Sequence, residues 1–190
     1  MNFEFVADTD ARLIRPIVHR DERGCFARTW CAETFSQAGV AFVPKQGNSS
    51  LSTLRGTVRG MHFQRPPHPD AKIVRCSRGR IHDVIVDLRP ESPTRGRIYA
   101  QELTAVSGVM LYIPGGFAHG FQTLVDDTLV EYLMGEFHVA DLYDGFRYDD
   151  PALPIVWPEP VRAISDRDRG WPDIAPRTPW LADAAPAGAL

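Results

Sequence analysis

Hydrophobic and polar residues alternate along this chain over short runs, and glycine or proline interrupts the runs at short intervals. Runs rich in β-branched residues predict strands at 13–18, 72–76, 80–88, 98–103, 109–113, 121–124 and 129–134. Ser77-Arg78-Gly79 has the composition of a hairpin turn between two of them. Many short strands separated by turns are typical of an all-β sandwich or barrel with antiparallel pairing.

Helical patterns are few and short. Residues 32–38 predict one helix, which Gly39 would end as a C-cap. A second helical turn is expected after Ser165, whose hydroxyl can cap residues 166–168. After Trp157-Pro158 the composition shifts towards Pro, Asp and Ala, and residues 181–190 have the character of a frayed tail. We expect one domain over residues 1–190.

The run 82–88 shows how the strands are arranged. Val84, Val86 and Leu88 make one face apolar, whereas Asp83, Ile85 and Asp87 share the other face. One face should therefore meet a core and the other a polar environment, as in a jelly roll, whose double sheet can enclose a polar pocket. Edge strands need cover, and the N-terminal segment could pair with a second subunit. A homodimer is expected on this argument.

Composition narrows the function classes. The formal net charge of −3 argues against a general grip on nucleic acid or on an anionic membrane. No apolar stretch approaches the roughly 20 residues that span a bilayer, and the N-terminus lacks the basic and apolar run of a signal peptide. Three cysteines without CxxC spacing indicate neither a disulfide framework nor a zinc site. The expected compartment is the cytoplasm.

Chemically informative residues gather at two places, the run 59–64 with Lys72 downstream, and the run 114–121. Histidine, arginine and lysine are costly within buried strands unless they have partners. A site that holds an anion and moves a proton would provide such partners. In a regular strand, Arg59 and His62 would point to opposite faces, so a shared site requires a break in the pleat, and Gly60 is the expected place.

The second run also carries a known spacing. Gly108, Pro114, Gly116 and His119 form G-x5-P-x-G-x2-H, which resembles the second motif of the cupin superfamily. A metal-binding cupin would also need a His-x-His and a glutamate near residues 60–75, and no glutamate lies between Glu33 and Glu91. A cupin-type jelly-roll β-barrel with a few short helices and no metal is therefore expected.

Together the motifs resemble those of the dTDP-4-dehydrorhamnose 3,5-epimerase family, non-metal cupins that rearrange nucleotide-linked 4-keto-6-deoxy sugars. The matching segments cover most of the chain: 21–26, 46–50, 56–64, 72–75, 83–89, 92–94, 113–121, 149–151, 155–158 and 165–168. The resemblance implies a cofactor-independent epimerase whose substrate is a nucleotide-diphospho-sugar.

The resemblance also assigns roles in the reaction. A proton next to a ketone is abstracted, an enolate is held, and a proton returns to the opposite face. His62 is the implied base and Asp168 its partner. Lys72 would stabilise the enolate oxygen, and Tyr132 would be the acid. Taken alone, Tyr132 could equally be a core tyrosine with a satisfied hydroxyl.

Substrate-binding residues follow from the same resemblance. Three diphosphate ligands are implied, Arg23, Arg59 and His119, since guanidinium groups suit phosphate oxygens. Phe26 would flank the nucleotide base, and Gln46 and Asn48 would lie near the sugar or the base.

Two positions depart from the family pattern. Arg28 stands where members often have a base-contacting glutamate, which leaves another nucleotide, such as CDP or GDP, open. His138 stands where many have a second tyrosine, which leaves open whether C3, C5 or both are epimerised. The alternatives are a single-carbon epimerase or keto-isomerase, a sugar-nucleotide-binding cupin without turnover, and a metal-dependent cupin oxygenase.

Overall fold

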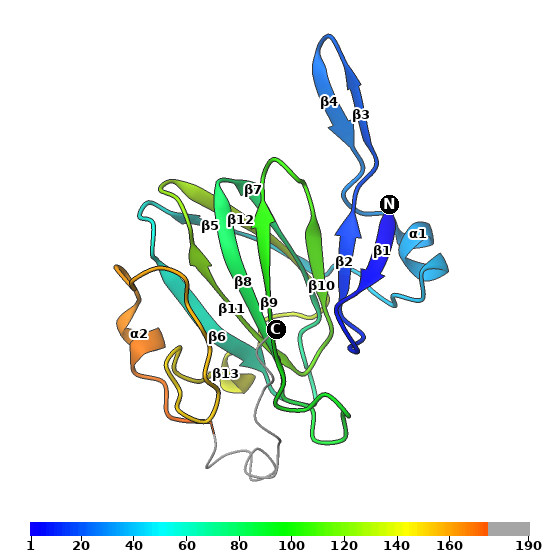
Figure 1. Cartoon of the computed structure of the whole chain (residues 1–190). Helices are drawn as coiled ribbons and strands as arrows, with labels where there is room; N and C mark the ends of the chain where they lie inside the picture. Colours follow the sequence, from blue (N-terminus) through cyan, green and yellow to red (C-terminus); the bar gives the residue numbers. More distant parts are fainter. Residues whose placement is uncertain (175–190) are drawn as a thin grey trace.

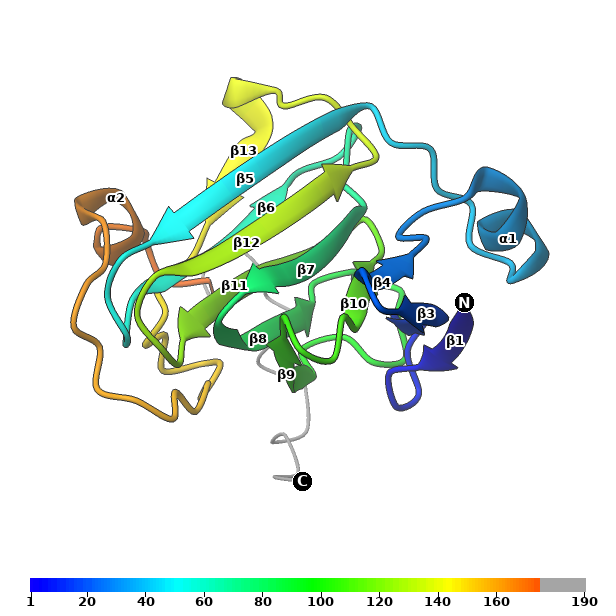
Figure 2. The same ribbon diagram turned by 90° about the horizontal axis from the view of Figure 1, so that it is seen from above.

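The computed structural model describes residues 1–174, so the expected frayed tail at 181–190 lies outside the described residues. Two antiparallel sheets face each other, with the larger sheet and the smaller sheet forming the two walls of a barrel (Figures 1 and 2). The architecture is the predicted all-β cupin-type jelly roll.

The larger sheet has six strands within residues 1–174. Their spatial order is β1 (Asn2–Phe5), β2 (Arg12–Arg15), β10 (Met110–Ile113), β7 (Lys72–Arg78), β12 (Thr128–Met134) and β5 (Gln46–Ser52). Among residues 1–174, β5 pairs only with β12 and therefore forms an edge of this sheet. The sequence did not predict β5 as a strand.

The smaller sheet has five strands in the same described range. Their order is β13 (Tyr143–Gly145), β6 (Val58–Gln64), β11 (Phe117–Thr123), β8 (Arg80–Asp87) and β9 (Ile98–Thr104). β6 and β11 are paired with a register shift between His119 and Phe121. This irregularity lies beside Gly60 and shapes the functional site.

A hairpin of β3 (Val18–Asp21) and β4 (Gly24–Ala27) projects from the barrel beyond the end of β2 (Figure 1). The sequence predicted one strand at 13–18, but Pro16, which has no N–H to donate, separates β2 from β3. All the residues of β3 are exposed, as are Gly24, Cys25 and Phe26 of β4.

The prediction of a hairpin turn at 77–79 was wrong. β7 and β8 belong to different sheets and do not pair with each other, so the turn carries the chain across the barrel. Gly79 has a φ of +85°, and a Cβ there would lie 2.4 Å from Thr128 Oγ1. The glycine correctly indicated a turn, but a left-handed turn can join two strands of different sheets as well as two strands of one hairpin.

Three short helical segments are present among the described residues. They are α1 (Ala32–Gln37), the 3-10 helix η1 (Ala140–Leu142) and α2 (Asp166–Arg169). Gly39 follows α1 with a φ of +72°, as expected for a glycine C-cap. Ser165 Oγ accepts from the N–H of Asp168 at 3.0 Å, which confirms the predicted cap of α2.

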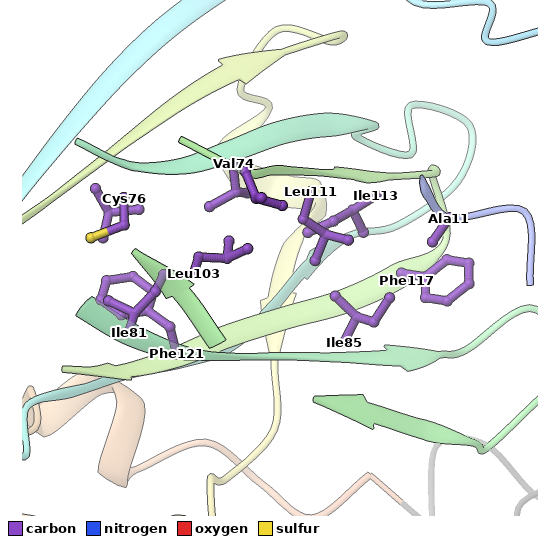
Figure 3. Close-up of a cluster of buried hydrophobic side chains, with 12 residues drawn as sticks. Ala11, Val74, Cys76, Ile81, Ile85, Leu103, Leu111, Ile113, Phe117 and Phe121 are labelled. Carbon is purple, nitrogen blue, oxygen red and sulfur yellow. The ribbon is translucent and has the colours of Figure 1, made fainter. Parts of the chain in front are cut away.

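The main core lies between the two sheets (Figure 3). Val74, Leu111 and Ile113 face Ile85 and Phe117 across it. Both faces of β8 are buried, because Val84 and Val86 pack on the outside of the smaller sheet in a second cluster with Phe146 and Leu153. The polar face expected at 82–88 is interior, with Asp83 and Asp87 both buried.

Among residues 1–174, no helix has both the length and the apolar character needed to cross a membrane.

Candidate active site

A cavity of about 410 Å³ opens between β5 and β12 of the larger sheet and β6 and β11 of the smaller one. It brings together nine of the residues that the sequence predicted for the site. They are Gln46, Asn48, Arg59, His62, Lys72, His119, Tyr132, His138 and Asp168.

One side of the cavity is built on β6 and α2, which carry His62 and Asp168. His62 Nε2 lies 2.6 Å from Asp168 Oδ1, and the N–H of Gly60 donates to Asp168 Oδ2 at 3.2 Å. Burial opposes ionisation of Asp168, but the hydrogen bond and charge of His62 outweigh it and hold the pKa of Asp168 below its usual range. A carboxylate on Nε2 leaves Nδ1 of His62 as the nitrogen that can accept a proton.

Gly60 allows Arg59 and His62 to reach the same cavity. Its φ is +133°, and a Cβ there would lie 2.5 Å from the Cα of Gly120. The pleat breaks at this residue, as the sequence predicted, because only glycine combines this φ with so close an approach of two strands.

Tyr132 approaches from the opposite wall. It lies on β12 of the larger sheet, whereas His62 lies on β6 of the smaller sheet. Burial raises the pKa of the Tyr132 phenol, and the charge of Asp83 adds to this effect, whereas Arg59 opposes it. The phenol therefore stays protonated at neutral pH and is available as an acid.

Lys72 is a buried cation at the start of β7. Its Nζ lies 2.9 Å from Asp70 Oδ2, and both side chains are less than a tenth exposed. Asp70 Oδ1 also accepts from the N–H of Gln64 at 3.0 Å. This pairing compensates the burial of the ammonium and keeps it fixed at the cavity wall.

Arginines add further positive charge. Arg59 Nε donates to Ser52 Oγ at 3.1 Å and its Nη2 donates to the carbonyl of Leu51 at 3.1 Å, which orients the guanidinium. Arg167, from α2, also lines the cavity and lies 4.7 Å from the ring centre of Tyr143 and 5.1 Å from that of Trp171. Oriented guanidinium groups suit a diphosphate.

Aromatic rings line one side of the cavity. The ring centres of His138 and Tyr143 are 5.1 Å apart, and those of His62 and Tyr143 are 5.4 Å apart. Phe137 is 60% exposed and lies at the cavity edge. The backbone N–H of His138 donates to Gln46 Oε1 at 3.3 Å, which ties this segment to β5.

His119 stands next to His62 on the smaller sheet and has a carboxylate of its own. His119 Nε2 lies 2.9 Å from Asp83 Oδ2, and both side chains are buried. The ring of His119 also meets that of Tyr132 edge-on, with centres 6.2 Å apart.

Three predicted binding residues are not in this cavity. Arg23 and Phe26 belong to the projecting hairpin, and Arg28 follows it directly. Arg23 pairs with Asp21, Phe26 is 69% exposed, and Arg28 Nη1 lies 3.8 Å from Cys31 Sγ. The chain does not fold these side chains onto its own site, because the hairpin leads away from the barrel (Figure 1).

Sequence reasoning missed several residues that line the site, notably Asp70, Tyr143 and Arg167. A buried lysine needs a carboxylate nearby, so Asp70, two residues before Lys72, could have been found by that criterion. Arg167 adjoins Asp168 within a motif already recognised. Nothing local marks Tyr143, which reaches the cavity only because β13 pairs with β6.

No cluster of three or more His, Cys, Asp or Glu side chains that could hold a metal ion occurs in the described part of the chain. The site offers a histidine–carboxylate pair, a phenol and several basic side chains. A jelly roll in which a histidine–carboxylate pair faces a phenol across a cationic pocket is the arrangement expected of a cupin enzyme of the epimerase class.

Comparison with known proteins gives the family. The sequence model of the dTDP-4-dehydrorhamnose 3,5-epimerase family matches residues 7–176. An enzyme of that name from Sinorhizobium fredii is 40% identical over 177 residues, which cover 92% of this chain and 90% of the relative. The chain belongs to the dTDP-4-dehydrorhamnose 3,5-epimerase family.

Solved structures agree in fold. A dTDP-4-dehydrorhamnose 3,5-epimerase from Bacillus anthracis, with TDP and PPi bound, is 39% identical and has a TM-score of 0.85, covering 89% of this chain and 98% of that one. A 3′-monoepimerase from Streptomyces bikiniensis, in complex with dTDP-quinovose, is 34% identical with a TM-score of 0.81, covering 88% of this chain and 86% of that one.

Proposed function

We propose that this protein epimerises a nucleotide-diphospho-4-keto-6-deoxyhexose at C3, C5 or both, as in dTDP-4-dehydrorhamnose 3,5-epimerases. The observation that carries the proposal is the placement of His62 and Tyr132 on opposite walls of one cavity. Inversion requires removal of a proton from one face of the sugar and its return to the other face. A base and an acid on opposite sheets provide this geometry.

His62 takes the proton next to the ketone at Nδ1, and Asp168 stabilises the imidazolium that forms. Lys72 faces the developing enolate oxygen, where a fixed, desolvated cation is most effective. Tyr132 then protonates the carbon from the other wall. The cycle needs no redox cofactor or metal.

Arg59 and His119 bind the diphosphate in this proposal, and Arg167 adds a second guanidinium group to the cavity wall. Gln46 and Asn48 contact the sugar or the base from the edge strand β5. His138 takes the side of the pocket where aromatic groups gather, next to Tyr143.

The remaining ligands come from a second subunit in a homodimer. Arg23, Phe26 and Arg28 stand on or beside a hairpin that reaches away from its own barrel. The edge strand β5, which carries Gln46 and Asn48, has no partner on one side within the described part of the chain. A partner's hairpin beside this edge would bring the missing guanidinium and phenyl groups to the site. We further propose that the chain acts as one domain, in the cytoplasm.

A second candidate is a single-carbon epimerase. It is favoured by His138, a smaller ring than tyrosine at a wall of the pocket, which meets Tyr143 edge-on. One similar structure is a 3′-monoepimerase. Because Arg28 replaces a base-contacting glutamate, the nucleotide base of the substrate is also to be tested.

The test is proton NMR in heavy water with dTDP-4-keto-6-deoxyglucose and catalytic amounts of protein. Loss of signal at C3 and C5 is expected for the double epimerase, and loss at one carbon for the alternative. His62→Ala should abolish the exchange, and retained exchange would remove His62 from the mechanism. Ligand binding without exchange, for this substrate and for its CDP and GDP analogues, would indicate a binding protein without turnover.

A further inference from the structure

Asp83 is a buried carboxylate that the proposed reaction does not use. It lies on β8 and is 1% exposed. Its Oδ2 bonds to His119 Nε2 at 2.9 Å, but its Oδ1 has no hydrogen-bond partner among residues 1–174. A buried carboxylate oxygen without a partner costs stability, and a protein that only needed to orient His119 could do so with a neutral amide.

The contacts of this carboxylate lead to Tyr132, the proposed acid, rather than to His62, the proposed base. His119 touches Tyr132 edge-on, with ring centres 6.2 Å apart. The negative charge of Asp83 also helps to raise the pKa of the Tyr132 phenol. Carboxylate, imidazole and phenol therefore form one contiguous group, which parallels the Asp168–His62 pair on the base side.

Turnover creates a need for such a group. When Tyr132 has given its proton to carbon, a phenolate remains in a buried site near a carboxylate, and no second epimerisation can start. His62 meanwhile holds the proton that it abstracted. The acid must be reprotonated within the cavity before the next cycle.

We propose that His119, held by Asp83, returns a proton to Tyr132 after each epimerisation. The N–H bond of the His119 imidazolium breaks and the O–H bond of the phenol forms, directly or through one water. The neutral imidazole then takes a proton from solvent, His62 releases one to solvent, and no net proton is consumed. Asp83 is a positioning residue that stabilises the imidazolium. The proposal rests on the proposed epimerase function.

The test compares a first turnover with later ones. Asp83→Asn keeps an acceptor for His119 but removes the charge that favours the imidazolium. Tyr132 starts protonated, so with enzyme in excess, rapid quenching should show the first epimerisation within about threefold of the wild-type rate. With catalytic enzyme, a burst of one event per site should precede a steady state slower by about 10²-fold, the scale of one acid–base contribution.

Asp87→Asn is the matched control. Asp87 lies on the same strand and is also buried, but it bonds to Arg89, Ser92 and Thr94 away from the cavity. The Asp87→Asn variant should show no burst, and its rates of first and later turnovers should keep the wild-type ratio. If Asp83→Asn does not fold, Asp83→Ser, which also removes the charge and leaves a hydroxyl, should show the same burst.

Equal losses in the first and later turnovers would overturn the relay, as would a raised KM with an unchanged kcat, which is expected if His119 only binds diphosphate. Both outcomes leave the proposed function intact, because the wild-type protein still turns over. Lack of exchange by the wild-type protein would instead overturn the proposed function, and the relay with it.

Discussion

Asp168 links the chemistry of one residue to the stability of the fold. Its carboxylate accepts from His62 and from the backbone of Gly60, and its pKa is lowered by these bonds despite burial. A lowered native pKa stabilises the folded state fully above the unfolded value of about 3.9. This contribution is lost as pH falls through the native pKa, when the native carboxylate must also be protonated.

We therefore predict that Asp168→Asn lowers the free energy of unfolding at pH 7, and that its difference from wild type shrinks as pH falls below about 4. Chemical denaturation at a series of pH values measures this. Asp149→Asn, which changes an exposed carboxylate, is the control and should keep the wild-type pH dependence. A difference between wild type and Asp168→Asn that does not vary with pH would show that ionisation of Asp168 is not what stabilises the fold.

In the proposed reaction, a change at Tyr132 separates the two proton transfers. With Tyr132→Phe, His62 and Lys72 still form the enolate, but only His62 can return a proton, and it does so to the original face. Deuterium exchange should persist while the inverted product falls about 10²–10⁴-fold, the usual contribution of a general acid. NMR in heavy water reports both quantities. Tyr99→Phe is the control, since the Tyr99 hydroxyl bonds to Asp8 outside the cavity, and exchange lost in parallel with inversion in Tyr132→Phe would contradict the assignment.

At the scale of elements, the site depends on one irregular contact between β6 and β11. Gly60→Ala would place a methyl group 2.5 Å from the Cα of Gly120, at a φ of +133°. We expect a loss of about 1–3 kcal/mol from the backbone strain alone, with activity falling further because Arg59 and His62 no longer share the cavity. Gly47→Ala is the control on β5, since its nearest contact would be 3.9 Å away. Denaturation and exchange assays of both variants test this, and a Gly60→Ala protein with wild-type stability and exchange would contradict it.

The elements also show what the sequence could and could not predict. β7, β8 and β12 were predicted because β-branched residues fill their buried positions. β5 was missed because an edge strand of polar residues has no hydrophobic pattern. The turn at 77–79 was misassigned because the conformation of Gly79 does not specify which sheet the next strand joins.

The site follows the same division. Motifs located His62, Lys72, Tyr132 and Asp168, whereas Tyr143 becomes part of the site only through strand pairing. The positions of Arg23 and Phe26 could not be inferred from one chain, because no local pattern states whether a hairpin folds back or reaches outward. The position of the hairpin depends on how whole subunits assemble.

At that scale, the proposed homodimer predicts shared sites. The hairpin with Arg23 and Phe26 projects from the barrel, and the predicted ligands around Gln46 and Asn48 lie on an open sheet edge (Figure 1). In a two-fold dimer each hairpin would serve the other subunit's cavity. A variant that lacks the hairpin side chains and a variant that lacks the base should then complement each other.

We predict this for Arg23→Ala/Phe26→Ala combined with His62→Ala. Each variant alone is expected to have little or no exchange activity. If the two are co-expressed with different tags and assemble at random, half of the dimers are hybrids, and each hybrid has one intact site of two. Activity should recover to about a quarter of the wild-type value if sites are shared across a two-fold axis.

Sedimentation velocity gives the oligomeric state, and hybrids isolated by both tags give the activity per dimer. A hybrid dimer without activity would show that each hairpin serves its own subunit, and a monomer in sedimentation would overturn the shared site altogether.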